Sequence, residues 1–281
     1  MAVPTRTLPS GDELPVVGLG TWDLAGETLV RALEAAVDAG YTHLDTAEGY
    51  ENETALGDAI AAADVDREDL FLTSKVLPKH LDYQSTIDAC EASLECLGTD
   101  HLDLYLIHWP NPAVSLRETL QAMASLVDRG LVRNVGVSNF STYQLATAHH
   151  VSPVPIAVNQ VEFHPYFQQP HVREYAAGTD TVVEAAAPLA RTAILDDETV
   201  RSVADARDRT PAQIVLRWAL DRDAVVLPKS SSPAHVRENL DLFDWSLTEA
   251  ERERLDALAR DESVYYDRAR DWTGDTYGIA E

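Results

Sequence analysis

The sequence predicts one α/β domain, residues 1–281, folded as a (β/α)8 barrel of the TIM type. Its length of 281 residues lies within the range of a single such barrel. Short apolar runs recur along the chain, each followed by a polar turn and an amphipathic helical pattern. The runs are continuous rather than alternating, which suits parallel strands that are buried on both faces.

The individual elements follow from this periodicity, after an N-terminal β-hairpin expected around residues 5–8 and 13–16. The eight predicted barrel strands are residues 16–19, 41–44, 70–73, 102–107, 132–137, 156–161, 181–186 and 224–227. The predicted helical segments between them are residues 27–39, 53–63, 83–97, 116–128, 142–149, 171–177 and 197–220.

Capping residues support the predicted helices. Thr210 is a suitable N-cap, with Pro211 at the first helical position and Gln213 at the third. Similar start signals stand at Ser232 and at Thr248, the latter opening an extra C-terminal helix, and the expected stop signals are Gly40, Gly98 and Gly130. The alternative fold is an open doubly wound sheet, but no Gly-x-Gly-x-x-Gly follows the first strand.

The composition is strongly acidic, with a formal net charge of −25 and only three lysines against 19 arginines. This charge argues against nucleic acid and anionic membranes as partners. A hydrophobic content of 45% also argues against disorder. We interpret the chain as a folded protein adapted to a salt-rich cytoplasm, because a Debye length of about 3 Å at 1 M salt removes most self-repulsion.

No signal points to a membrane or to an oxidising compartment. No apolar run approaches about 18 residues, and residues 1–10 lack an apolar signal core, so a cytoplasmic location is expected. Cys90 and Cys96 lie six residues apart, on different faces of one helix. Neither a disulfide nor a metal site is predicted, and both are expected to be small core residues.

Polar residues follow several of the predicted strands, where barrel enzymes carry their chemistry. Asp45 ends the second strand with Tyr50 just beyond, Lys75 follows the third, and His108 follows the fourth. A phenol with a pKa of roughly 10 donates a proton only if a nearby cation lowers that pKa. Taken alone, the stretch 43–53 favours a structural Asp and a surface Tyr, but Lys75 supplies the cation that catalysis needs.

Taken together, these motifs resemble the aldo-keto reductase superfamily over nearly the whole chain, and the short loops are more similar to its microbial members. The matching segments are His43-Leu44-Asp45-Thr46-Ala47 with Tyr50, Ser74-Lys75, Leu106-Ile107-His108-Trp109-Pro110, Gly136-Val137-Ser138-Asn139-Phe140, Asn159-Gln160-Val161-Glu162, Pro188-Leu189 and Leu227-Pro228-Lys229-Ser230.

The resemblance implies NAD(P)H-dependent reduction of an aldehyde or ketone to an alcohol, with a small carbonyl compound as the substrate. Tyr50 would be the general acid, Lys75 would stabilise its phenolate, Asp45 would hold Lys75, and His108 would orient the substrate oxygen. Two tryptophans would wall the pocket, Trp22 and Trp109.

The resemblance also implies NADPH as the cofactor, with NADH possible. Its binding residues would be Ser138, Asn139, Gln160 and Leu189 at the nicotinamide end, and Lys229, Ser230, His235, Glu238 and Asn239 at the adenosine end. His235 stands where the family usually has Arg, and Arg237 is a candidate substitute. Ala186 stands where an aromatic usually stacks on the nicotinamide, and Phe163 and Tyr166 are candidates to replace that face.

Two other functions remain open at this stage. One is a barrel isomerase that binds phosphate through Lys229 and Ser230, although no Gly-rich loop follows the seventh strand. The other is a nucleotide-binding regulatory subunit with little turnover. A monomer is expected, and the substrate depends on loops 110–116, 191–197 and 263–281, which the sequence does not define.

Overall fold

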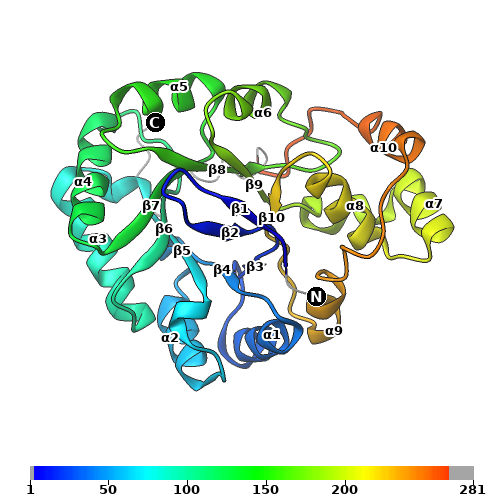
Figure 1. Ribbon diagram of the computed structural model, residues 1–281, viewed down its shortest axis with the longest axis horizontal. Helices are drawn as coiled ribbons and strands as arrows, with labels where there is room; N and C mark the ends of the chain where they lie inside the picture. The colour runs from blue at the N-terminus through cyan, green and yellow to red at the C-terminus, as the bar shows by residue number, and fades with distance from the viewer. Residues whose placement is uncertain (1–2, 266–281) are drawn as a thin grey trace.

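The computed structural model describes residues 3–265, in which helices surround a ring of parallel strands (Figure 1). The strands are β1 (Thr5–Thr7), β2 (Glu13–Pro15), β3 (Leu19–Gly20), β4 (His43–Asp45), β5 (Phe71–Val76), β6 (Leu102–Ile107), β7 (Val132–Ser138), β8 (Ile156–Glu162), β9 (Val182–Ala186) and β10 (Val225–Val226). The helices are α1 (Gly26–Ala39), α2 (Glu53–Ala62), α3 (Tyr83–Leu97), α4 (Leu116–Asp128), α5 (Thr142–Val151), α6 (Pro170–Ala177), α7 (Glu198–Arg207), α8 (Pro211–Leu220), α9 (Pro233–Glu238) and α10 (Glu249–Asp256).

Strands β3 to β10 pair in sequence order and all in parallel. The ring closes between its first and last strands through a parallel bridge between Val17 and Val226, with Gly18 N donating to Val226 O at 2.9 Å. Gly20 N donates to Pro228 O at 3.1 Å, and a Cβ on Gly20 would lie only 3.0 Å from Leu227 O. The predicted barrel is therefore confirmed, and Gly20 permits the close approach of its two closing segments.

The predicted hairpin, β1 with β2, lies across the middle of the ring in Figure 1. Its Leu8 and Leu14 are buried against apolar side chains of the barrel strands, among them Phe71, Leu104 and Val158. A larger apolar cluster joins the strands to the surrounding helices. The hairpin thus closes the amino-terminal end of the barrel and leaves the carboxyl ends of the strands for the functional site.

The helix start signals at Thr210, Ser232 and Thr248 are confirmed, since each side chain accepts a backbone N–H of the first turn. The predicted helical segment 197–220 is wrong as one unit. It forms two helices, α7 and α8, because Asp208 adopts a left-handed φ of 52° that ends the first. The expectation that both cysteines are core residues also fails, because Cys90 is buried but Cys96 is exposed.

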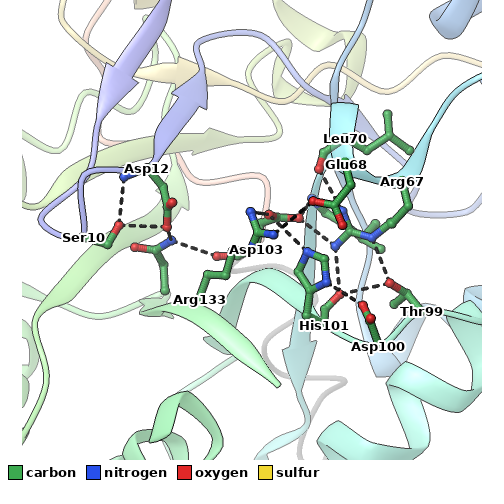
Figure 2. Close-up of polar contacts among 12 residues, drawn as sticks. Ser10, Asp12, Arg67, Glu68, Leu70, Thr99, Asp100, His101, Asp103 and Arg133 are labelled. Atoms are coloured by element: carbon green, nitrogen blue, oxygen red, sulfur yellow. Dashed lines mark hydrogen bonds and ion pairs between the residues drawn. The ribbon is translucent and has the colours of Figure 1, made fainter. Parts of the chain in front are cut away.

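A polar network centred on Asp103 of β6 lies at the hairpin end of the barrel (Figure 2). This carboxylate accepts from Arg67 Nη2 at 2.8 Å and from the backbone N–H of Leu72 at 2.9 Å. Asn134 donates both to Asp103 O and to Asp12 of the hairpin. The network ties the starts of β5, β6 and β7 to the loop of the hairpin.

None of the helices within residues 3–265 combines the length and the apolar character needed to cross a membrane.

Candidate active site

The segment between β4 and α2 is held by the buried side chain of Asn52. Its amide donates to Thr21 O and to Leu24 O, both at 2.9 Å, and accepts from Thr46 Oγ1 at 3.0 Å. The backbone then turns through a 3-10 segment, Glu48–Tyr50, and a left-handed Glu51 with φ of 54°. Asn52 therefore ties the loop that carries Tyr50 both to the end of β4 and to the segment that follows β3.

Lys75 of β5 is fully buried beneath this loop. Its ammonium donates to Asp45 Oδ1 at 2.7 Å, to Thr46 O at 2.7 Å and to Tyr50 Oη at 3.2 Å. All three N–H groups thus have acceptors, and one carboxylate balances the buried charge. A phenol oxygen that accepts from an ammonium is poised to release its proton, because the phenolate is stabilised there.

His108 follows β6 and faces Tyr50 edge to face, with ring centroids 5.6 Å apart. Its backbone is fixed by Val76 O, and by Asn139 Nδ2, which donates to His108 O at 2.9 Å. Burial holds the pKa of His108 well below its usual value, and the positive charge of Lys75 acts in the same direction. The imidazole is therefore neutral at neutral pH and suited to donating a hydrogen bond rather than a proton.

A cavity of about 560 Å³ opens at the carboxyl ends of the strands beside these groups. The candidate residues that line it are Trp22, Asp45, Tyr50, His108, Trp109, Ser138, Asn139, Gln160, Leu189, Lys229, Ser230 and His235. Ser138 Oγ and Asn139 N both donate to Gln160 O. These hydrogen bonds hold together three of the residues expected at the nicotinamide end of the cofactor. Lys75 lies below the floor, and Glu238 and Asn239 do not line the cavity.

The cationic end of the cavity contains Lys229, whose ammonium lies 3.8 Å from a carboxylate oxygen of Asp23. Arg237, the candidate substitute for a family arginine, does not line the cavity. Its Nη2 lies 3.7 Å from Oδ2 of Asp38 in α1. Arg191, at the start of the predicted loop 191–197, does line the cavity.

Neither aromatic expected to compensate for Ala186 reaches the cavity. Phe163 stacks on Trp218 with centroids 4.9 Å apart, and Tyr166 donates to Asp197 at 2.8 Å. Tyr265, in the loop 263–281 that is expected to shape the pocket, lines the cavity together with Ala186.

Tyr265 is held in place by Glu162 at the end of β8, which accepts from Val264 N at 2.7 Å and from Tyr265 N at 3.3 Å. Its ring packs edge to face against that of Trp109, with the ring centroids 6.1 Å apart. The guanidinium of Arg191 lies over the rings of both Tyr265 and Trp22. The rest of the predicted C-terminal loop, residues 266–281, lies outside the described residues. No sequence signal places Tyr265 here, because its position depends on a contact across about a hundred residues.

Within residues 3–265, no group of three His, Cys, Asp or Glu side chains is arranged to hold a metal ion.

Comparisons with known proteins agree with the barrel fold. A family model described as the Aldo/keto reductase family matches residues 16–260. An aldo-keto reductase of Mycolicibacterium smegmatis is 42% identical over 246 residues, covering 87% of this chain and 90% of that protein. A glyoxal reductase of Bacillus subtilis is 39% identical over 261 residues, 92% and 94% of the two chains. The solved structure of a Bombyx mori aldo-keto reductase in complex with NADP superposes with a TM-score of 0.90 at 30% identity, covering 100% of each chain.

Proposed function

The chain belongs to the aldo/keto reductase family, and on that premise we propose how its own residues reduce an aldehyde or ketone to an alcohol with NADPH. When bound, the nicotinamide supplies the hydride that the carbonyl carbon accepts. The observation that carries the assignment of roles is the contact of 3.2 Å between the buried Lys75 ammonium and the Tyr50 hydroxyl, at the edge of the cavity.

Tyr50 gives its proton to the carbonyl oxygen as the hydride arrives, and a proton from solvent restores it. Lys75 stabilises the phenolate that remains, and Asp45 keeps Lys75 oriented and its charge balanced. The neutral His108 donates a hydrogen bond that positions the carbonyl oxygen beside the phenol. Trp22 and Trp109 exclude water from the reacting atoms.

The cavity suits a dinucleotide. One hollow connects Tyr50 and His108 with Lys229, Ser230 and His235, and a cation beside hydroxyl groups is the chemistry that a phosphate binds. We assign Ser138, Asn139 and Gln160 to the carboxamide, and Lys229 and Ser230 to the adenosine 2′-phosphate. Because His235 is shorter than the family arginine and lacks its forked guanidinium, Lys229 carries most of the preference for NADPH over NADH.

Removing the Lys229 ammonium is therefore expected to weaken NADPH binding by about tenfold and NADH binding by less than twofold. Fluorescence titration of Lys229→Ala with both cofactors measures this difference, and Lys79→Ala is a control that removes the same charge at an exposed position that does not line the cavity. Equal losses for the two cofactors would refute the role of Lys229, and tighter NADH binding by the wild type would overturn the NADPH preference.

The substrate proposed is a small aldehyde or ketone, since the aromatic residues Trp22, Trp109 and Tyr265 line the same cavity as Tyr50 and His108. A panel of aldehydes, ketones, sugars and glyoxal, followed by NADPH absorbance in molar KCl, tests the activity. Binding of NADPH with no turnover across the panel would instead favour a nucleotide-binding subunit.

We further propose that the chain acts as a single-domain monomer in a salt-rich cytoplasm. The net charge of −25 supports this, because self-repulsion on such a surface is relieved by screening. The melting temperature is expected to rise by on the order of 10 °C between dilute buffer and molar KCl. Equal stability in both would contradict salt adaptation, and a mass above 30.9 kDa by light scattering would contradict the monomer.

A further inference from the structure

One ionisable residue stands in the middle of an otherwise apolar strand: Glu184 of β9, whose side chain is fully buried. Its Oε2 accepts from Gln160 Nε2 at 3.0 Å. The same nitrogen donates to Asp45 Oδ2 at 2.8 Å. Hydrogen bonds thus run without a break from Tyr50 through Lys75, Asp45 and Gln160 to a carboxyl group that the reaction described above does not use.

This arrangement occupies both hydrogens of the Gln160 amide. One points to Asp45 and the other to Glu184, so the amide oxygen is the group left to face the cavity that Gln160 lines. Asp45 alone accepts only one hydrogen of the Gln160 amide, which limits the flexible Gln160 side chain less than two acceptors do. A second acceptor behind the amide fixes its plane as well as its direction.

We propose that Glu184 is a positioning residue for the reaction, because it fixes the Gln160 amide from behind and so sets the nicotinamide end of the cofactor site. The inference rests on the cofactor site proposed above. Glu184 itself contacts neither substrate nor cofactor and acts through Gln160.

The charged groups around Glu184 agree with a neutral carboxyl group. Asp45 and His43 face it from β4, Lys75 lies on β5, and His43 Nε2 is 3.9 Å from Glu184 Oε1. Burial, and then the charge of Asp45, raise the pKa of Glu184 to about 8. Burial lowers the pKa of His43 to about 4. Near neutral pH, Glu184 and His43 therefore carry no charge, and Asp45 pairs with the Lys75 ammonium at 2.7 Å.

Binding experiments separate this role from a general structural one. Glu184→Gln keeps an acceptor for Gln160, whereas Glu184→Leu has similar bulk and no acceptor. NADPH and 2′,5′-ADP, which lacks the nicotinamide, are titrated by fluorescence against both variants and the wild type. We expect Glu184→Gln to bind NADPH within about twofold of the wild type and Glu184→Leu about tenfold more weakly, with unchanged 2′,5′-ADP binding in both.

The outcomes distinguish the two proposals. A wild type that binds neither ligand contradicts the cofactor site itself. A wild type that binds both, with Glu184→Leu weakening both equally or neither, overturns the role of Glu184 alone. If Glu184→Leu does not fold, Glu184→Asp withdraws the carboxyl group from Gln160 by one methylene, and it must weaken NADPH but not 2′,5′-ADP.

Thermal melting against pH provides a readout without ligand. The unfolded chain releases this proton near the ordinary glutamate pKa of 4.5, whereas the folded chain keeps it until about pH 8. Glu184 therefore contributes stability below pH 4.5 that is lost as the pH rises to about 8. The melting temperature of Glu184→Gln relative to the wild type should rise between pH 5 and pH 8. A difference that does not change with pH would show that Glu184 is ionised in the folded protein and overturn the neutral acid.

Discussion

Replacing Tyr50 by Phe is expected to lower kcat by about 10³-fold, because positioned proton donors contribute roughly 10²- to 10⁴-fold. Phe keeps the ring that faces His108 but removes the hydroxyl that accepts from Lys75 at 3.2 Å. The loss corresponds to about 4 kcal/mol of transition-state stabilisation. Steady-state kinetics with an aldehyde that the wild type reduces measures it.

The dissociation constant for NADPH should change by less than threefold in the same variant, since the proposed cofactor contacts do not include the Tyr50 hydroxyl. Tyr143→Phe is a matched control: this tyrosine is 81% exposed on α5 and its variant should retain full activity. If Tyr50→Phe kept at least a third of the wild-type kcat, the proposed acid catalysis would be wrong.

Replacing Asp103 by Ala is expected to destabilise the fold by about 3 kcal/mol, equivalent to a fall of roughly 6–12 °C in melting temperature. The side chain is 6% exposed, and its loss leaves the buried Leu72 N–H without its acceptor and the Arg67 guanidinium without its carboxylate partner, although Arg67 still donates to the carbonyls of Leu70 and His101 (Figure 2). Removing one member of a buried ion pair costs more than the pair contributes, because the remaining charge stays desolvated. Chemical denaturation in molar KCl provides the free energy of unfolding.

Activity at 25 °C should survive in Asp103→Ala, because the network lies at the hairpin end of the barrel and the proposed catalytic groups lie at the other end. Asp58→Ala removes a carboxylate from an exposed position of α2 and should change the unfolding free energy by less than about 0.5 kcal/mol. Similar stabilities of the two variants would show that Asp103 is not a structural centre.

Much of the fold follows from local patterns. The runs at 102–107 and 132–137 become β6 and β7 almost residue for residue. A strand that is buried on both faces is a nearly continuous apolar run, so the ends of the run mark the ends of the strand. The segment 197–220 is two helices rather than one, because the left-handed Asp208 ends α7 and the extended Thr210 caps the start of α8, where Thr210 and Pro211 already signal a helix start in the sequence. Short strands at the closure, such as β10, form because partners on both sides complete them.

The sequence by itself determined the barrel, and it placed an acid, a phenol, a lysine and a histidine at neighbouring strand ends, because periodicity and strand order are local properties that parallel pairing converts into proximity. Only the tertiary structure decided that Tyr265 lines the cavity beside Ala186, that Arg237 turns away to Asp38, and that Glu184 meets the Gln160 amide. Those contacts depend on how the closed barrel staggers its strands and on which side chains meet across its interior, and no spacing along the chain encodes either.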